Sequence, residues 1–138
     1  PYFCGSFGNA DSVHSYGRDA AYAVDTARRK VAKAIGANPG EIYFTSGGTE
    51  ADNWAVRGLA TANADKGKRI IVSDIEHAAV LSAAELLKKE GIAVDYLKTE
   101  PNGIVSPEKL DNMLKNDSAV LVSVMTANNE IRTLQPLV

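Results

Sequence analysis

The stretch that decides the fold is Phe44-Thr45-Ser46-Gly47-Gly48-Thr49-Glu50-Ala51-Asp52-Asn53. It joins residues 41–45, whose β-branched and aromatic side chains predict a strand, to residues 49–62, whose apolar spacing predicts a helix. The pair Gly47-Gly48 lets the backbone turn tightly and approach a ligand closely. We expect Thr49 to cap the helix, whose first amides lack helical acceptors and can therefore bind a phosphate. The alternative is an ordinary turn that happens to contain two glycines.

The rest of the chain alternates predicted strands and helices. Residues 69–73 and 119–125 are apolar runs typical of strands buried on both faces, and residues 92–97 predict a further strand. Helices are predicted over 16–35 and 78–90, and another begins at Ser106-Pro107-Glu108, where Ser106 is the expected cap. Strands separated by helices form parallel sheets with helices on their faces. The predicted fold is therefore α/β with a mostly parallel sheet.

Apolar residues at helical spacing predict which side of a helix is buried. In the helix over 16–35, the expected buried stripe is Ala20, Val24, Ala27, Val31 and Ala34. In the helix over 49–62, the expected buried stripe is Ala51, Trp54, Ala55, Leu59 and Ala62.

Composition excludes several classes of function. The chain has 138 residues, enough for one domain with a core, and its net charge of −2 gives no reason to expect nucleic acid as a partner. No apolar run is long enough to cross a membrane, so no membrane partner is expected. The single cysteine, Cys4, cannot form an internal disulfide, which favours a reducing, cytoplasmic location. The first residue is not methionine and Val138 is followed by no polar tail, so we expect a piece of a longer protein.

Polar segments follow three of the predicted strands. They are Ser46-Gly47-Gly48-Thr49, Glu76-His77 and Asn128-Asn129-Glu130. Ligands of parallel α/β sheets bind beyond the carboxyl ends of the strands, so these segments predict a cofactor site on one edge of the sheet. Because loops are polar in any case, coincidence is the alternative.

An ordered set of motifs resembles the cysteine desulfurases of the NifS and IscS type, in the class V aminotransferase group of pyridoxal-phosphate enzymes. Besides the stretch over 44–53, the matching motifs are Ser12-Val13-His14-Ser15-Tyr16-Gly17-Arg18, Ile75-Glu76-His77-Ala78-Ala79-Val80-Leu81, Asn102-Gly103-Ile104-Val105 and Val122-Ser123-Val124-Met125, ending in Asn128-Asn129-Glu130-Ile131. The resemblance implies the three-layer αβα large domain of a fold-type I enzyme, incomplete here. Residues 1–36 would be an N-terminal loop and helix, and residues 37–138 the first part of that cofactor-binding domain.

Roles carry over by resemblance at a few positions. Gly48 and Thr49 match the residues that hold the phosphate of pyridoxal 5′-phosphate. His77 matches the catalytic histidine that stacks on the pyridine ring and takes part in proton transfer, although a capping histidine is the plainer reading of the residue alone. Asn129 matches the asparagine that hydrogen-bonds the phenolic oxygen of the ring. His14 is expected to be structural or to lie near a subunit interface, and no metal ligands are expected.

The family's reaction defines what else to expect. These enzymes are homodimers that convert L-cysteine to L-alanine and pass an enzyme-bound persulfide sulfur to an acceptor protein. The lysine that carries the cofactor and the catalytic cysteine match positions beyond Val138, so we expect this chain to be inactive by itself. A selenocysteine lyase, another class V aminotransferase and a non-catalytic dimerising remnant are the alternatives.

One departure from the family pattern bears on the site. Arg132 stands where the family usually has glycine after Asn-Asn-Glu-Ile. An arginine at a position that needs a glycine-like backbone angle is expected to distort the loop that orients Asn129. This departure is the feature that favours the non-catalytic remnant.

Overall fold

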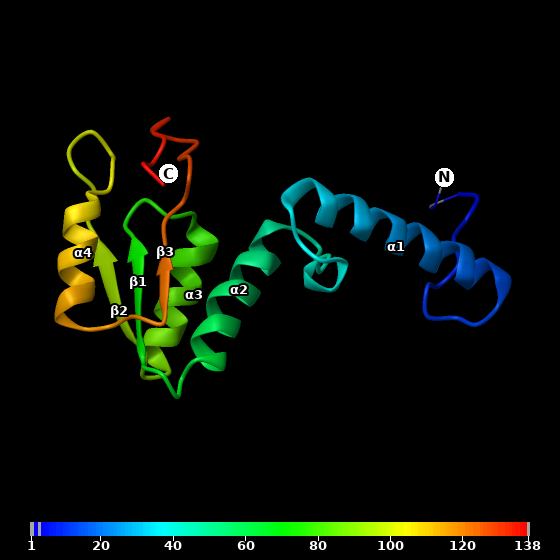
Figure 1. Ribbon diagram of the computed structural model, residues 1–138, viewed down its shortest axis with the longest axis horizontal. Helices are drawn as coiled ribbons and strands as arrows, with labels where there is room; N and C mark the ends of the chain where they lie inside the picture. Colours follow the sequence, from blue (N-terminus) through cyan, green and yellow to red (C-terminus); the bar gives the residue numbers. More distant parts are fainter. Residues whose placement is uncertain (1, 3, 138) are drawn as a thin grey trace. The chain divides into compact units, whose positions relative to one another are not determined.

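The computed structural model describes residue 2 and residues 4–137, and the chain divides into two compact units, Pro1–Phe44 and Thr45–Val138 (Figure 1). Of the loop expected at the start of the chain, residues 1 and 3 lie outside the described part. The predicted boundary between residues 36 and 37, which concerns the large domain of the family, stays a prediction.

The smaller unit is built on helix α1 (Ser15–Ile35), followed by the short 3-10 helix η1 (Pro39–Glu41). His14 caps α1, because its Nδ1 accepts a hydrogen bond from the backbone N–H of Gly17 at 3.1 Å. Gly36 ends α1 with φ +70°, in the left-handed region that favours glycine. The helix predicted over residues 16–35 is confirmed to within one residue at each end, and the structural role of His14 is that of an N-cap.

The strand predicted over residues 41–45 is wrong. Glu41 ends η1, and residues 42–45 have no strand structure. The N–H of Ile42 donates to the carbonyl of Pro39, and the carbonyl of Ile42 accepts from the Arg28 guanidinium, so this backbone is bonded within its own unit. Strand propensity alone cannot produce a strand where no neighbouring strand is available for pairing.

The larger unit contains a parallel sheet between helices. Its elements are α2 (Gly48–Ala62), β1 (Arg69–Ser73), α3 (Ala78–Lys89), β2 (Ala93–Leu97), α4 (Pro107–Asn116) and β3 (Leu121–Ser123). The strand order is β2-β1-β3, and β1 pairs in parallel with both neighbours, with Ile71 opposite Asp95 on one side and Val122 on the other. The prediction of an α/β fold with a parallel sheet is confirmed.

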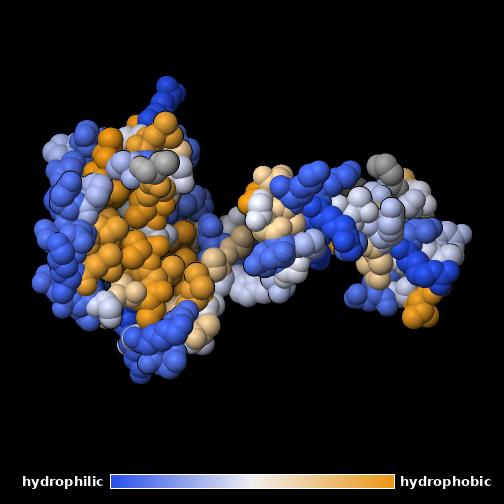
Figure 2. All heavy atoms as spheres, viewed as in Figure 1, coloured by the Kyte–Doolittle hydropathy of each residue, from blue (hydrophilic) through white to orange (hydrophobic). Residues whose placement is uncertain are grey.

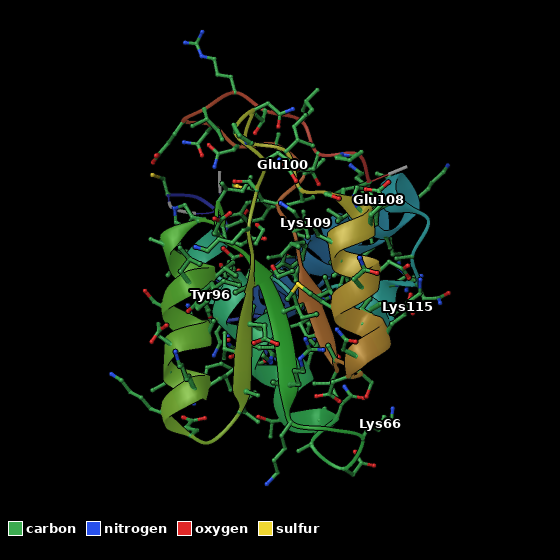
Figure 3. The ribbon with its side chains drawn as sticks, turned by 90° about the vertical axis from the view of Figure 1, so that its left-hand side faces the viewer. Lys66, Tyr96, Glu100, Glu108, Lys109 and Lys115 are labelled. Atoms are coloured by element: carbon green, nitrogen blue, oxygen red, sulfur yellow. The ribbon has the colours of Figure 1, made fainter. Side chains whose placement is uncertain are left out.

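Alternate residues of β1 enter two separate cores. Ile70 and Val72 pack with side chains of α2 and α3, whereas Ile71 packs with Leu97 and Val105. Figure 3 shows the sheet between α3 on one side and α4 on the other. Residues 70–73 of β1 are all buried, as predicted for a strand covered on both faces.

Apart from Ala20, which is buried, the apolar stripes predicted for α1 and α2 are exposed. Val24 and Val31 of α1 are 41% and 40% exposed, and the buried residues of α1 are Gly17, Ala20 and Ala32. In α2, the predicted stripe is exposed and the buried residues are Val56 and Ala60. Helical spacing shows that a face is apolar, but whether it is buried depends on which element packs against it.

The predicted strand over 119–125 is reduced to β3, which lies at an edge of the sheet. Val122 is consequently 36% exposed, and Figure 2 shows hydrophobic residues gathered over the sheet in the larger unit. Among the described residues, no helix is long and apolar enough to cross a membrane.

Tyr96 of β2 supplies a pH-dependent term in stability. A hydrogen bond to the Glu85 carboxylate, together with burial, raises the pKa of Tyr96 to about 12. Because the folded pKa lies above that of an unfolded tyrosine, this stabilisation is complete below about pH 10 and is lost as pH rises toward 12. NMR titration of tyrosine ring carbons should show Tyr96 titrating last, and Glu85→Gln should return its pKa toward the ordinary value. An unchanged titration in that variant would contradict the assigned cause.

Candidate active site

The segment after β1 places Glu76 and His77 at the carboxyl edge of the sheet. Glu76 is only 8% exposed, and its Oε1 accepts hydrogen bonds from the hydroxyls of Ser73 at 3.2 Å and Ser123 at 3.1 Å. His77 is the N-cap of α3, where its Nδ1 accepts from the N–H of Ala79 at 3.1 Å. A neutral imidazole that accepts at Nδ1 has its proton at Nε2, so His77 presents an N–H donor. His77 therefore has the capping role, which leaves Nε2 available for chemistry.

The turn after β3 is held together by Asn128. Its Nδ2 donates to the carbonyl of Ile75 at 2.9 Å, and its Oδ1 accepts from the N–H groups of Glu130 and Ile131 at 2.8 and 3.0 Å. The side chain thus ties the turn to the segment that follows β1. Asn129, the next residue, is exposed and has no such structural task among the described residues.

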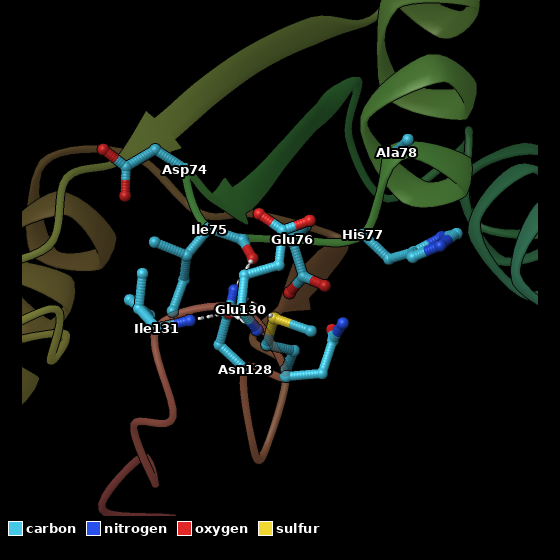
Figure 4. Close-up of a pocket in the computed structure, with 10 residues that line it drawn as sticks. Asp74, Ile75, Glu76, His77, Ala78, Asn128, Glu130 and Ile131 are labelled. Carbon is cyan, nitrogen blue, oxygen red and sulfur yellow. Dashed lines mark hydrogen bonds between the residues drawn. The ribbon is translucent and has the colours of Figure 1, made fainter.

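These two segments line one cavity of about 320 Å³ (Figure 4). Its lining consists of Asp74, Ile75, Glu76, His77, Ala78, Met125, Asn128, Asn129, Glu130 and Ile131. The structure therefore brings together His77 and Asn129, which were both predicted to bind the cofactor. That they bind it stays a prediction.

The turn before α2 lies at a different pocket. Thr49 lines a hollow with Ser46, Asn53 and Trp54, and this hollow shares no residue with the cavity at His77. Thr49 is also not the cap of α2. The N-cap is Gly47, which has no side chain that could accept a capping hydrogen bond. Of the three polar segments expected on one edge of the sheet, only the two that follow β1 and β3 lie there, since the described residues before Ser46 contain no strand.

The α2 terminus nevertheless offers free donors. In the described part of the chain, the amides of Gly48 and Thr49 have no acceptor, and a Cβ added at Gly48 would meet no atom within 4 Å. The N–H and hydroxyl of Ser46 donate instead to Glu50, at 2.7 and 2.6 Å, and hold the pKa of that carboxyl below its ordinary value. An added anion would therefore find the Gly48 and Thr49 amides open and Ser46 already engaged.

Sequence reasoning missed Gln135, which joins the segment after β3 to the loop at Gly103. Its side chain is buried, accepts from the N–H of Val105 at 2.8 Å and donates to the carbonyl of Gly103 at 2.9 Å. Gly103 has φ +75°, and a Cβ there would lie 2.6 Å from the side chain of Ile131. A glutamine near the end of the printed sequence carries no pattern that could have signalled this contact.

Arg132 adopts the backbone angle expected of a glycine. Its φ is +58°, the one positive φ at a non-glycine among the described residues, and its N–H donates to the carbonyl of Asn128 at 2.9 Å. The hydrogen bonds of the turn are therefore kept, without the expected distortion. The energetic cost of placing an arginine at this position is instead backbone strain at its left-handed angle.

Replacing Arg132 by glycine should relieve this strain. A left-handed angle costs a residue with a Cβ about 1 kcal/mol, part of which is offset by the greater freedom of glycine in the unfolded chain. We expect Arg132→Gly to raise the free energy of unfolding by about 0.5 kcal/mol in urea denaturation. Arg132→Ala keeps the Cβ, so it should give no such gain; an equal gain in both variants would assign the effect to charge or side chain instead.

The same fold is found in known proteins. The family model for class V aminotransferases matches residues 1–138. The chain belongs to this family. Among relatives of this class V aminotransferase chain, the cysteine desulfurase IscS of Methanosarcina thermophila is 50% identical over 137 residues, which cover 99% of the chain and 34% of that relative. The chain thus spans about a third of the length of the curated relatives it matches.

Solved structures agree with this family assignment. A NifS-like protein superposes with a TM-score of 0.90 at 38% identity, covering 98% of the chain and 37% of that protein. A structure described as SspA in complex with cysteine gives a TM-score of 0.85 at 32% identity, covering 99% of the chain and 39% of that protein. The fold is therefore that of the NifS and IscS type of class V aminotransferase, as predicted.

Proposed function

We propose that this chain forms the N-terminal part of a pyridoxal-phosphate-dependent cysteine desulfurase. The observation that carries the proposal is the cavity in which the His77 and Asn129 segments meet at the carboxyl edge of the sheet. Sequence and structural relatives named as cysteine desulfurases, and one solved with cysteine, support the choice of substrate. The overall reaction would convert L-cysteine and an enzyme thiol to L-alanine and an enzyme persulfide.

The donors and acceptors present fit the chemical groups of the cofactor. The open amides of Gly48 and Thr49 would bind a phosphate at the N-terminus of α2, where the helix dipole favours negative charge. The carboxamide of Asn129 would orient a phenolic oxygen. Pyridoxal phosphate, when bound, supplies an electron sink for carbanion chemistry.

His77 would hold a proton at Nε2 for transfer during turnover. Its Nδ1 is occupied by the N–H of Ala79 at the start of α3, which fixes both the ring orientation and the tautomer. A histidine positioned in this way can donate from Nε2 and take the proton back at the same atom. The hydrogen bond from Asn128 to Ile75 maintains the spacing between the His77 segment and Asn129.

The rest of the proposal concerns the whole protein. A homodimer, a sulfur-acceptor protein and a cytoplasmic location follow from the family resemblance and from the single cysteine. Cys4 is free and exposed, and we assign it no part in the reaction. The intact turn at Arg132 removes the observation that favoured a non-catalytic remnant.

Pyridoxamine 5′-phosphate is the sharper probe of this proposal, because it has no aldehyde and cannot react with exposed lysines. We expect weak, reversible binding in calorimetry or NMR, and at least tenfold weaker binding after Thr49→Ala, which keeps the open amides but removes a hydroxyl donor to the charged phosphate. Thr61→Ala, at the other end of α2, is the matched control and should leave affinity unchanged. Absent binding, or equal losses in both variants, would contradict the phosphate site.

A second arm tests the lysine. Titration with pyridoxal phosphate, followed by borohydride and mass analysis, should trap no single preferred lysine in this chain. An adduct confined to one lysine would show that the chain holds its own Schiff base, against the expectation from the family resemblance.

A further inference from the structure

Glu76 is a buried carboxylate with one oxygen left for a ligand. Its Oε1 accepts from the hydroxyls of Ser73 on β1 and Ser123 on β3, while no described residue donates to its Oε2. Glu76 is 8% exposed and lines the cavity at His77, with its side chain between the segment after β1 and the turn after β3 (Figure 4). Because no fully buried side-chain oxygen among the described residues lacks a partner, Oε2 is accessible from the cavity, where it can accept a hydrogen bond from a bound molecule.

The surroundings of Glu76 suit a hydrogen-bond acceptor. It directly precedes His77, the N-cap of α3, where the helix dipole stabilises anions. Both serine hydroxyls point their hydrogens at the carboxylate. The side chain therefore acts as a hydrogen-bond acceptor, and a carboxylate makes the stronger, charge-assisted kind of hydrogen bond to a cation.

The lining of the cavity selects a cation. Three of its residues are acidic, Asp74, Glu76 and Glu130, and none is a lysine or arginine. Asp74 is engaged by the Lys98 ammonium at 3.5 Å and by the N–H of Thr99, whereas Glu76 Oε2 and the exposed Glu130 are free. A cavity lined by one sign of charge concentrates ions of the other sign.

We propose that this cavity binds a primary ammonium group through Glu76 Oε2. Within the described part of the chain, no group of three metal-ligating side chains exists, which favours a nitrogen cation over a metal ion. Ile75, Ala78 and Met125 line the same cavity and provide an apolar surface for a short alkyl body. The inference rests on the proposed function for its view of the cavity as an amino-acid site. Both the α-ammonium of a free amino acid and a lysine side chain have this chemistry.

The test is an NMR titration of the isotope-labelled chain with n-propylammonium chloride at constant ionic strength. We expect saturable shifts of the His77 and Asn129 amides, with a midpoint in the millimolar range, and no response to 1-propanol. In the wild-type chain, the carboxyl carbon of Glu76 should shift more than that of Glu130. A larger shift at Glu130, a response that does not saturate, or an equal response to 1-propanol would overturn the inference.

Glu76→Gln separates charge from shape. The glutamine amide oxygen can still accept from Ser73 and Ser123, so we expect the spectrum of a folded chain with at least tenfold weaker ammonium binding. Glu130→Gln, an exposed acid on the same cavity, should weaken binding at most threefold. Unchanged affinity in Glu76→Gln would overturn the inference, and the carboxyl-carbon shift in the wild-type chain decides the case if that variant does not fold.

Two further arms separate the sources of the ligand and the two proposals. Tighter binding of L-alaninamide would identify an α-ammonium, and tighter binding of Nα-acetyl-lysine methylamide would identify a lysine side chain. Pyridoxamine phosphate is titrated into the same samples. Its binding without an ammonium response would overturn this inference alone, whereas an ammonium response without its binding would overturn the proposed function alone.

Discussion

Leu87→Ala is expected to lower the free energy of unfolding by about 3 kcal/mol. Leu87 is 2% exposed and packs in the core formed by α2, α3 and the Ile70 and Val72 side of β1. Truncation removes buried methyl groups and leaves a cavity between elements that the rest of the core holds in place. Urea denaturation followed by circular dichroism measures the loss.

The neighbouring residue provides the control. Leu86 lies on the same helix but is 39% exposed, so Leu86→Ala should cost less than about 1 kcal/mol. The two variants remove the same atoms from adjacent positions and differ only in which side of α3 they change. Equal losses would mean that α3 packs in a different rotational setting.

Arg69→Met should lower the free energy of unfolding by about 2–3 kcal/mol, because it leaves several partners unsatisfied. The Arg69 side chain is 12% exposed, and its Nε donates to Asp95 of β2 at 2.7 Å. Its guanidinium also donates to the carbonyls of Met113 and Asp117, at the end of α4. One side chain thus joins the start of β1 to the neighbouring strand and to a helix terminus.

Two variants separate geometry from charge in this effect. Arg69→Lys keeps the charge but not the planar fork, so it should recover less than half of the lost stability. Arg57→Met removes an ion pair with Glu90 whose side chains are about half exposed, and should cost less than about 1 kcal/mol. If Arg69→Lys proved as stable as the wild-type chain, charge alone would explain the effect.

Elements that depend on local sequence were predictable. The apolar run of β1 and the cap at Ser106 follow from periodicity and backbone chemistry, and the structure confirms them. The strand over 41–45 and, apart from Ala20, the buried stripes of α1 and α2 were wrong, because strand pairing and burial require a partner, which propensity cannot supply.

The candidate site was predictable to the same degree. Strand order places His77 and Asn129 at one edge of the sheet, which needs only the topology rule for parallel sheets. The separate tasks of Asn128 and Asn129 could not be read from two identical neighbours, because only the structure shows which carboxamide closes the turn. The free Oε2 of Glu76 could not be predicted either, because both serine donors bond the other oxygen, Oε1. These donors, Ser73 and Ser123, are 50 positions apart in the sequence.

The contact between Gln135 and the loop at Gly103 has a consequence for how such chains diverge. A side chain at Gly103 would collide with Ile131, and Gln135 holds the same loop by hydrogen bonds to the carbonyl of Gly103 and the N–H of Val105. Substitutions at these three positions are therefore not independent, and each is tolerated only in certain backgrounds of the others. Among descendants of a common ancestor, we expect positions 103, 131 and 135 to covary, although residues 103 and 135 lie far apart along the chain.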